Sequence, residues 1–347
     1  MKLLEGISSA LVQTERLKVH YLERPGAGPT VLFVHGNVSS GAFWQEIMQD
    51  MGSEYRALAP DLRGYGETEA LPIDATAGLD DMVQDLVSFV KALKLNSFHL
   101  AGHSMGGGIV MKLAMVMPEK LLSVTLVDPM SPYGFAGSKG PEGSPSYADG
   151  APAGAAGVNP DFIKLLARKY NKGDEQMAPV NVFRSFYIKP PFQAPNEEMF
   201  LESMLSTRVG DDWYPGNFEA STNWPGAAPG TKGVANAFAR KYFDASAFMN
   251  INPKPPVLWV RGEEDQIVSN NSMFDISALG ALGAVPGWPG EDACPPQPML
   301  DQTRGVLESY RKNGGRYREE VIADAGHSPF IDQKSEFKKI FFPFLKV

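Results

Sequence analysis

Gly102-His103-Ser104-Met105-Gly106 is the stretch of this sequence that decides the fold. An apolar run, 98–101, precedes it and a glycine-rich apolar segment, 107–114, follows it, so the local order is strand, sharp turn, helix. In a G-x-S-x-G turn the serine hydroxyl is exposed at the end of a strand, and the glycines let strand and helix approach closely. The helix N-terminus also offers free N–H groups to an anion. This context predicts that Ser104 is a catalytic nucleophile, although the five-residue pattern alone occurs by chance in many proteins.

Apolar runs alternate with helical patterns on both sides of this turn. An apolar face at helical spacing between residues 79 and 93 predicts one helix, and 333–345 reads as an amphipathic helix that closes the chain. Strands that alternate with helices predict an α/β fold, with a mostly parallel sheet and helices on both faces. The expected strands are 8–12, 17–22, 30–34, 55–60, 98–101, 122–127, 256–260 and 317–322.

Two segments interrupt this alternation. Residues 131–250 begin with a stretch rich in Gly, Pro, Ala and Ser, and residues 270–300 hold further Gly and Pro pairs. Both follow the C-terminal ends of strands, where open α/β sheets bind their ligands. We therefore expect a core of 1–130 and 251–347, a helical cap (lid) insertion at 131–250 and a second loop insertion at 270–300 near the site; the alternative is tolerated surface loops. Helices are expected in the cap at 161–170, 180–188, 196–208 and 234–249.

Composition favours a soluble enzyme with a small-molecule substrate. The chain has 347 residues, of which 43% are hydrophobic and 21% charged, and a formal net charge of −8. The negative charge argues against nucleic acid or an anionic membrane as a partner. No signal-peptide pattern or membrane-spanning run is present, so a cytoplasmic location is expected. Cys294 is the single cysteine and no His/Cys metal cluster appears, so we expect neither a metal nor an organic cofactor.

A serine nucleophile needs a base, and elimination among the five histidines leaves His327. It lies just after the last expected strand, in a loop that can return over the serine turn. His103 adjoins Ser104, but neighbouring residues on a tight turn point apart. The remaining histidines lie within early strands or open a turn: His20, His35 and His99.

The base in turn needs a carboxylate to orient it, and the tetrahedral intermediate needs two N–H donors. Asp265, which closes a turn after strand 256–260, is the preferred acid. Asp128, at the end of the preceding strand, and Glu263 or Glu264 are the alternatives. The amide of Met105 comes with the serine turn, and the second donor is expected from Asn37, unless Gly36-Asn37 is only a strand-exit turn.

As a set, these motifs resemble the α/β-hydrolase superfamily over about 1–130 and 251–347. The resemblance implies Ser104 as nucleophile, Asp265 as acid, His327 as base, and Asn37 and Met105 as oxyanion donors. The motifs that carry it are His35-Gly36-Asn37, Asp61-Leu62-Arg63-Gly64-Tyr65-Gly66, Gly102–Gly106, Gly262–Asp265 and Gly326-His327-Ser328-Pro329.

Two branches of that superfamily are also similar to this chain. The Gly36-Asn37 turn and Trp44 resemble haloalkane dehalogenases and epoxide hydrolases, but those families carry aspartate at the serine position. Ser104 therefore argues against dehalogenation and epoxide opening.

The sequence thus predicts a capped serine hydrolase, of esterase or lactonase type, that forms an acyl-enzyme without a cofactor. Trp213, Trp224 and Trp288 are candidate walls for an apolar acyl pocket, with further aromatic candidates in Tyr214, Phe218, Phe183, Phe186 and Tyr187. The alternative is that each of these side chains belongs to the packing of the insertions themselves. Alternatives are cleavage of amides, peptides or carbon–carbon bonds, and a hydrolase-like ligand receptor. A peptidase would use acidic residues of the cap to bind a free amine; the candidates are Glu197, Glu198, Glu202, Asp211 and Asp212.

Overall fold

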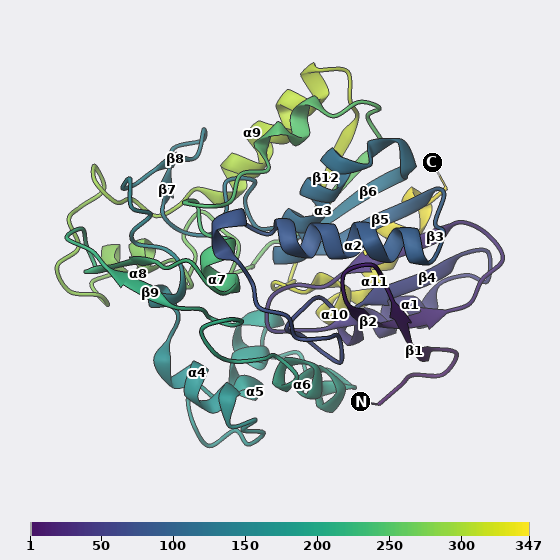
Figure 1. Ribbon diagram of the computed structural model, residues 1–347, viewed down its shortest axis with the longest axis horizontal. Helices are drawn as coiled ribbons and strands as arrows, with labels where there is room; N and C mark the ends of the chain where they lie inside the picture. Colours follow the sequence, from purple (N-terminus) through teal and green to yellow (C-terminus); the bar gives the residue numbers. More distant parts are fainter. Residues whose placement is uncertain (1, 347) are drawn as a thin grey trace.

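An eight-stranded sheet forms the centre of the computed structural model, which describes residues 2–346 (Figure 1). The pairs β1–β2 and β2–β4 are antiparallel, and all other neighbours are parallel, which confirms the predicted sheet. The central strands β3 and β5 are buried along their whole length, as parallel strands covered on both faces require. The order is β1 (Ser8–Gln13), β2 (Lys18–Arg24), β4 (Arg56–Pro60), β3 (Thr30–Val34), β5 (Phe98–His103), β6 (Leu121–Val127), β11 (Val257–Gly262) and β12 (Tyr317–Ile322).

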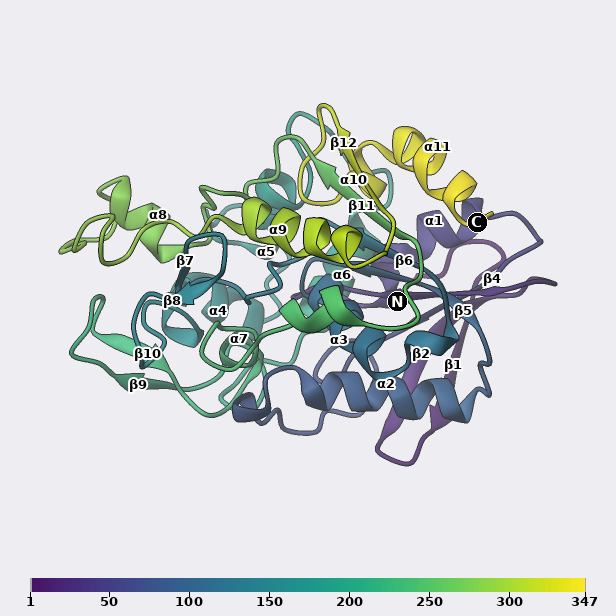
Figure 2. The same ribbon diagram turned by 90° about the horizontal axis from the view of Figure 1, so that it is seen from above.

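Helices cover both faces of the sheet (Figure 2). The helices α2 and α3 lie on one face, and α1 and α11 on the other. The face of α2 predicted to be apolar is buried, with Met82, Leu86 and Val90 at 2% exposure or less. Among the described residues no helix has both the length and the apolar character needed to span a membrane. The helix bounds are α1 (Gln45–Asp50), α2 (Asp80–Ala92), α3 (Met105–Val116), α9 (Met299–Lys312), α10 (Pro329–Asp332) and α11 (Lys334–Phe344).

Residues 131–250 connect β6 to β11 and gather at one end of the sheet, together with α8 (Ile276–Ala281) of the second insertion (Figure 1). They hold short helices and two small antiparallel ribbons, β7–β8 and β9–β10. Their bounds are β7 (Ser138–Lys139), β8 (Ser144–Pro145), α4 (Pro160–Ala167), α5 (Pro179–Val182), a π-helix at Phe183–Tyr187, α6 (Glu197–Leu205), β9 (Phe218–Ala220), β10 (Ala227–Pro229) and α7 (Val234–Ala237).

The continuous helix expected at 234–249 is wrong. The chain forms α7, leaves the helical path, and resumes with a 3₁₀ turn at Ser246–Asn250. Between them the amide of Ala245 donates to the Pro132 carbonyl, and the Arg240 guanidinium donates to the Gly143 carbonyl. Hydrogen bonds to the start of the same insertion therefore replace helical ones, a tertiary effect that apolar spacing does not encode.

Candidate active site

Ser104 lies in the sharp turn between β5 and α3, with φ 56° and ψ −122°. A positive φ is uncommon for a residue with a Cβ and persists only where its surroundings hold it. Here the Ser104 amide donates to the Val127 carbonyl at 3.0 Å, and the Ser104 carbonyl accepts from the amides of Gly107 at 2.9 Å and Met130 at 3.0 Å. The strained turn is thus fixed by β6 on one side and by α3 on the other.

The two glycines that flank Ser104 are required by close approach of the backbone. A Cβ on Gly102 would lie 2.4 Å from the Gly106 carbonyl oxygen, and a Cβ on Gly106 would lie 2.5 Å from the carbonyl oxygens of Val34 and His35. Any side chain at either position would push strand, turn and helix apart. This is the physical reason for the glycine pattern on which the sequence prediction depends.

His327 and Asp265 come together from the ends of two neighbouring strands, β12 and β11. The His327 Nδ1–H donates to Asp265 Oδ2 at 2.7 Å, and both side chains are at most 3% exposed. The other carboxylate oxygen, Oδ1, accepts from the amides of Ile267 at 2.7 Å and Val268 at 3.0 Å. Asp265 is therefore immobilised, and it fixes the tautomer in which His327 Nε2 is unprotonated.

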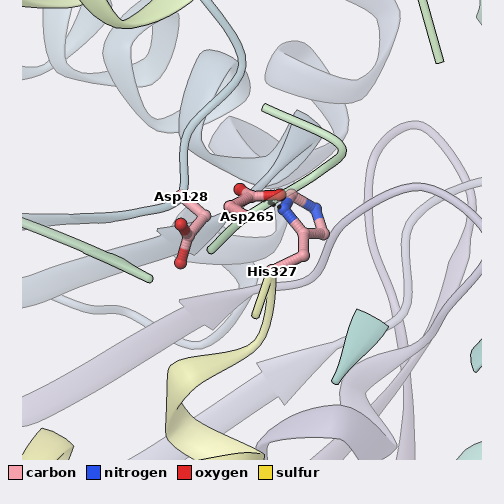
Figure 3. Close-up of side chains that lie close together, drawn as sticks. All are labelled: Asp128, Asp265 and His327. Carbon is pink, nitrogen blue, oxygen red and sulfur yellow. Dashed lines mark hydrogen bonds and ion pairs between the residues drawn. The ribbon is translucent and has the colours of Figure 1, made fainter. Parts of the chain in front are cut away.

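Asp128, the alternative acid, lies on the far side of Asp265 from the imidazole (Figure 3). Its Oδ1 accepts from the Gly262 amide at 2.9 Å, and no hydrogen bond joins it to His327. Burial, and then the neighbouring charge of Asp265, raise the pKa of Asp128 well above its ordinary value, which favours the neutral form of that carboxyl. Of the two carboxyl groups, Asp265 is the one that is hydrogen-bonded to His327.

The same three side chains are close enough to offer ligand atoms to a cation, since their donor atoms lie within 4.8 Å of one another. Asp265 and His327 already share a direct hydrogen bond of 2.7 Å, which a metal ion would have to replace. This geometry suits an acid–base pair rather than a preformed cation site.

His103 has a supporting contact that the sequence did not suggest. Its Nε2–H donates to the backbone carbonyl of His327 at 2.8 Å, and the two rings lie 4.7 Å apart between centroids. Burial, and then the nearby His327, lower the pKa of His103 well below its ordinary value, so the ring stays neutral. His103 therefore holds the backbone beneath the expected base.

His20 forms a second, separate Ser–His–Asp arrangement. Its Nδ1 contacts Asp61 Oδ2 at 2.7 Å, and its Nε2 contacts the Ser9 hydroxyl at 2.7 Å, at the junction of β1 and β2. Asp61 also accepts from the amides of Gly41 and Glu67, which makes it a structural anchor of the turn after β4. None of these groups lines the cavity described below.

The loop that holds Asn37 packs directly on the serine turn. A Cβ on Gly36 would lie 2.9 Å from the Ser104 Cβ, so only glycine allows this approach. Met105 is the first residue of α3, and an amide in that position has no acceptor within its helix. Asn37, Ser104, Met105 and His327 all line one cavity.

That cavity has a volume of about 470 Å³ and walls that are mainly aromatic, methionine and aliphatic. No Asp, Glu, Lys or Arg is among the described residues that line it. Most of its wall comes from residues 131–250, and Ile276 and Leu279 of the second insertion add to it. Its exposed rim is also built by the two insertions, from Gly157, Asn159, Gln176, Met273 and Phe274. A ligand would therefore reach Ser104 by passing between them.

The three tryptophans singled out in the sequence lie elsewhere. Trp213 packs against Gly64 and its Nε1–H donates to the carbonyls of Ala70 and Leu71, both at 3.2 Å. Trp224 and Trp288 enclose Gly280, and their indole N–H groups donate to the carbonyls of Pro286 and Cys294. None of the three lines the cavity. Three other aromatics offered by the sequence do line it, Phe186, Tyr187 and Tyr214, whereas Phe183 and Phe218 do not. The rest of the aromatic wall is formed by Phe135, Phe162, Phe238 and Phe274.

Sequence comparison relates the chain to known proteins. The family model of the alpha/beta hydrolase fold matches residues 29–287. An epoxide hydrolase of Caballeronia sordidicola is 36% identical over 34% of this chain and 36% of its own length. The N-formylmaleamate deformylase of Pseudomonas putida is 29% identical over 50% of this chain and 63% of its own length. Bifunctional epoxide hydrolase 2 of Sus scrofa is 33% identical over 95% of this chain and 53% of its own length. The chain thus spans less than two thirds of each relative.

Solved structures share the architecture at low sequence identity. A bromoperoxidase from Bacillus anthracis aligns with a TM-score of 0.62 and 17% identity, over 98% of this chain and 100% of that one. An esterase from Thermogutta terrifontis aligns with a TM-score of 0.59 and 19% identity, over 98% of each chain. At such identities the likeness concerns the fold alone.

Proposed function

Because the chain belongs to the alpha/beta hydrolase fold family, we propose that it is a serine hydrolase that cleaves a carboxylic ester or lactone. One observation carries the proposal. Ser104 and His327 line the same apolar cavity, and His327 is fixed by Asp265 with Nε2 as the available base. The strained turn at Ser104 and the amides of Asn37 and Met105 supply the remaining parts of acyl transfer.

The proposed reaction has two halves. Ser104 Oγ attacks the ester carbonyl while His327 Nε2 takes its proton, and the oxyanion is stabilised by the amides of Asn37 and Met105. His327 then protonates the leaving alkoxide, which leaves an acyl group on Ser104. Water, deprotonated by His327, attacks that ester and releases the acid. Asp265 stabilises the imidazolium formed in each half, because its carboxylate accepts the Nδ1–H at 2.7 Å.

The nucleophile itself separates ester cleavage from the activity named for the epoxide hydrolase relatives. An aspartate that opens an epoxide forms an ester, which water can hydrolyse. A serine that opened an epoxide would form an ether, which water does not cleave, so the enzyme would be trapped after one turnover. Acyl transfer instead gives an acyl-serine that water can release, and Ser104 favours that chemistry.

The cavity also favours an uncharged substrate over a peptide with a free amine. The five acidic residues that a peptidase was expected to use do not line it. Glu197 pairs with Arg184, and Asp212 pairs with Lys232. A charged substrate group would be desolvated against apolar walls with no opposite charge to meet it, at a cost of several kcal/mol.

We further propose that residues 131–250 act as a cap that selects the acyl group. The cavity volume of about 470 Å³ lies in the range that holds a drug-sized molecule, and methionine side chains in its wall can adapt to different shapes. Both features support an ester with a large apolar acyl part.

The test uses purified protein and two kinds of reagent. We expect a fluorophosphonate to modify Ser104, located by mass spectrometry of the peptides, and to modify neither Ser9 nor any other serine at the same rate. A panel of p-nitrophenyl esters from acetate to laurate, set beside lactones, aminoacyl anilides and a styrene oxide assay, identifies the bond cleaved. Turnover of the epoxide without ester hydrolysis would refute the proposal.

A further inference from the structure

Val38, next to the proposed oxyanion donor Asn37, has a backbone conformation that its side chain does not favour. Its φ is 47°, in the left-handed region, and a β-branched residue there is a genuine outlier. Such strain persists only where surrounding contacts over-determine it. The loop that carries Asn37 must therefore be held from outside.

The hydroxyl groups of three tyrosines contact this loop. The Tyr65 hydroxyl, from the turn after β4, donates to Asn37 Oδ1 at 2.6 Å and lies beside the Val38 amide. The Tyr187 hydroxyl, from the first insertion, donates to the Asn37 backbone carbonyl at 3.0 Å. The Tyr214 hydroxyl, also from that insertion, lies beside the Asn37 side chain. Hydrogen bonds thus fix both the side chain and the backbone carbonyl of Asn37.

We propose that Tyr65, Tyr187 and Tyr214 are positioning residues, which hold the strained Asn37–Val38 peptide so that the Asn37 amide faces the oxyanion. With φ and ψ of Asn37 constrained from its carbonyl side, the direction of its own N–H is constrained too. Oxyanion donors act through preorganisation, and a displacement of about 1 Å can cost about 100-fold in rate. Two of the three hydroxyls come from 131–250, so that insertion completes the oxyanion site as well as covering the cavity. This inference rests on the proposed function, because it concerns the same acyl transfer.

The tyrosines differ in a way that separates positioning from substrate binding. Tyr187 and Tyr214 line the cavity and so could also contact a substrate, whereas Tyr65 does not line it and is 2% exposed. Burial raises the pKa of all three well above the ordinary value, so each remains a neutral hydrogen-bond partner through the working pH range. If removal of the Tyr65 hydroxyl lowers kcat, the effect is therefore explained by the position of Asn37 and its loop.

The experiment compares Tyr65→Phe and Tyr187→Phe with Tyr310→Phe. Tyr310 is the matched control, because its buried hydroxyl donates to the Pro255 carbonyl at 2.6 Å, away from the cavity. For each variant we would measure the melting temperature, kcat and KM with p-nitrophenyl butyrate, and inhibition by phenylboronic acid, which forms a tetrahedral adduct on a serine. We expect both loop variants to lose about tenfold or more in kcat and in boronate affinity, with KM changed less than about threefold. Tyr310→Phe should change only the melting temperature.

The outcomes separate this inference from the proposed function. If wild-type protein hydrolyses the ester but Tyr65→Phe and Tyr187→Phe behave like Tyr310→Phe, the positioning role is overturned and the proposed function stands. If only Tyr187→Phe is impaired, and in KM, then Tyr187 binds substrate and the positioning role is again overturned. If Tyr187→Phe fails to fold, Tyr65→Phe decides alone. If wild type neither hydrolyses esters nor reacts with a fluorophosphonate, the proposed function fails and this inference fails with it.

Discussion

Replacement by asparagine should lower kcat far more at Asp265 than at Asp128. In Asp265→Asn the side-chain amide can turn an N–H toward His327 Nδ1. Two N–H donors then face each other, unless His327 moves its proton to Nε2, in which case Nε2 is no longer available as a base. In a comparable triad this change costs about 10⁴ in kcat, or roughly 5 kcal/mol of transition-state stabilisation. The contact that is lost is the 2.7 Å hydrogen bond, inside a site whose two side chains are at most 3% exposed.

Asp128→Asn changes much less. Burial and then the charge of Asp265 raise the pKa of the Asp128 carboxyl well above the ordinary value and so favour its neutral form. An asparagine keeps an oxygen to accept from the Gly262 amide, now 2.9 Å from Oδ1, and offers an N–H where the carboxylic acid carries its proton. We expect kcat within about threefold of wild type.

The assay is ester hydrolysis by the purified variants across pH 5 to 9, with circular dichroism to establish that each is folded. Asp128→Leu serves as a harsher control, since it removes both the acceptor and the proton donor and should lower kcat more than Asp128→Asn does. A folded Asp128→Asn protein that is as inactive as Asp265→Asn would refute the reasoning and move the orienting acid to the end of β6.

The other predictions concern the nucleophile, the cavity wall and the base loop. Ser104→Ala should fold normally and lose about 10⁴ to 10⁶ in kcat, and a folded variant with more than a tenth of wild-type activity would exclude Ser104 as nucleophile. Phe186→Ala and Phe274→Ala, whose rings meet edge to face at 5.1 Å in the cavity wall, should shift acyl-chain preference about tenfold, whereas Trp224→Ala and Trp288→Ala should leave it unchanged. Burial raises the pKa of Asp332 to about 6, so the fold loses stability as pH rises from about 4 through 6. Asp332→Asn has no carboxyl group at this position and should not lose this stability. In urea titrations, the difference between the unfolding free energies of the variant and of the wild type should grow to roughly 3 kcal/mol by pH 7.

Sequence patterns could place the candidate catalytic residues because those residues come shortly after strands of the sheet. Ser104, Asp265 and His327 each follow a parallel strand, and the C-terminal ends of such strands meet at one edge. The glycines around Ser104 form a short local pattern in the sequence, which can be recognised without a structure, although the contact of Gly106 is with the distant carbonyls of Val34 and His35.

What sequence reasoning missed depends on contacts between distant segments. The tryptophans were chosen for their size, but their indole N–H groups find backbone carbonyls within the insertions or, for Trp213, in the loop after β4. Tyr187 contacts a residue 150 positions away in the chain, a relation that no local pattern encodes. The raised pKa of Asp128 likewise depends on the pairing of β6 and β11, which buries its carboxyl and brings it beside Asp265.

One short segment of the first insertion ties the two sides of the site together. Tyr187 holds the Asn37 carbonyl and also packs its ring edge to face on His327, at 6.0 Å between centroids. Two residues on, the Lys189 amide donates to Asp332 Oδ2 at 2.8 Å, and the same oxygen accepts from the amide of Gly326, beside His327, at 2.7 Å. Residues 187–189 therefore contact the loop that holds Asn37 and the loop that holds His327 at once.

This double attachment constrains how a substrate can enter. If the whole insertion lifted as a lid, it would break the Tyr187 and Lys189 contacts and disorganise both loops each time. The exposed rim of the cavity lies elsewhere, at Gly157, Asn159 and Gln176 on one side and at Met273 and Phe274 on the other. Movement of that rim alone would admit an ester while Asn37 and His327 stay in place. We therefore expect the cavity to open between the rims of the two insertions, with residues 187–189 as its fixed side.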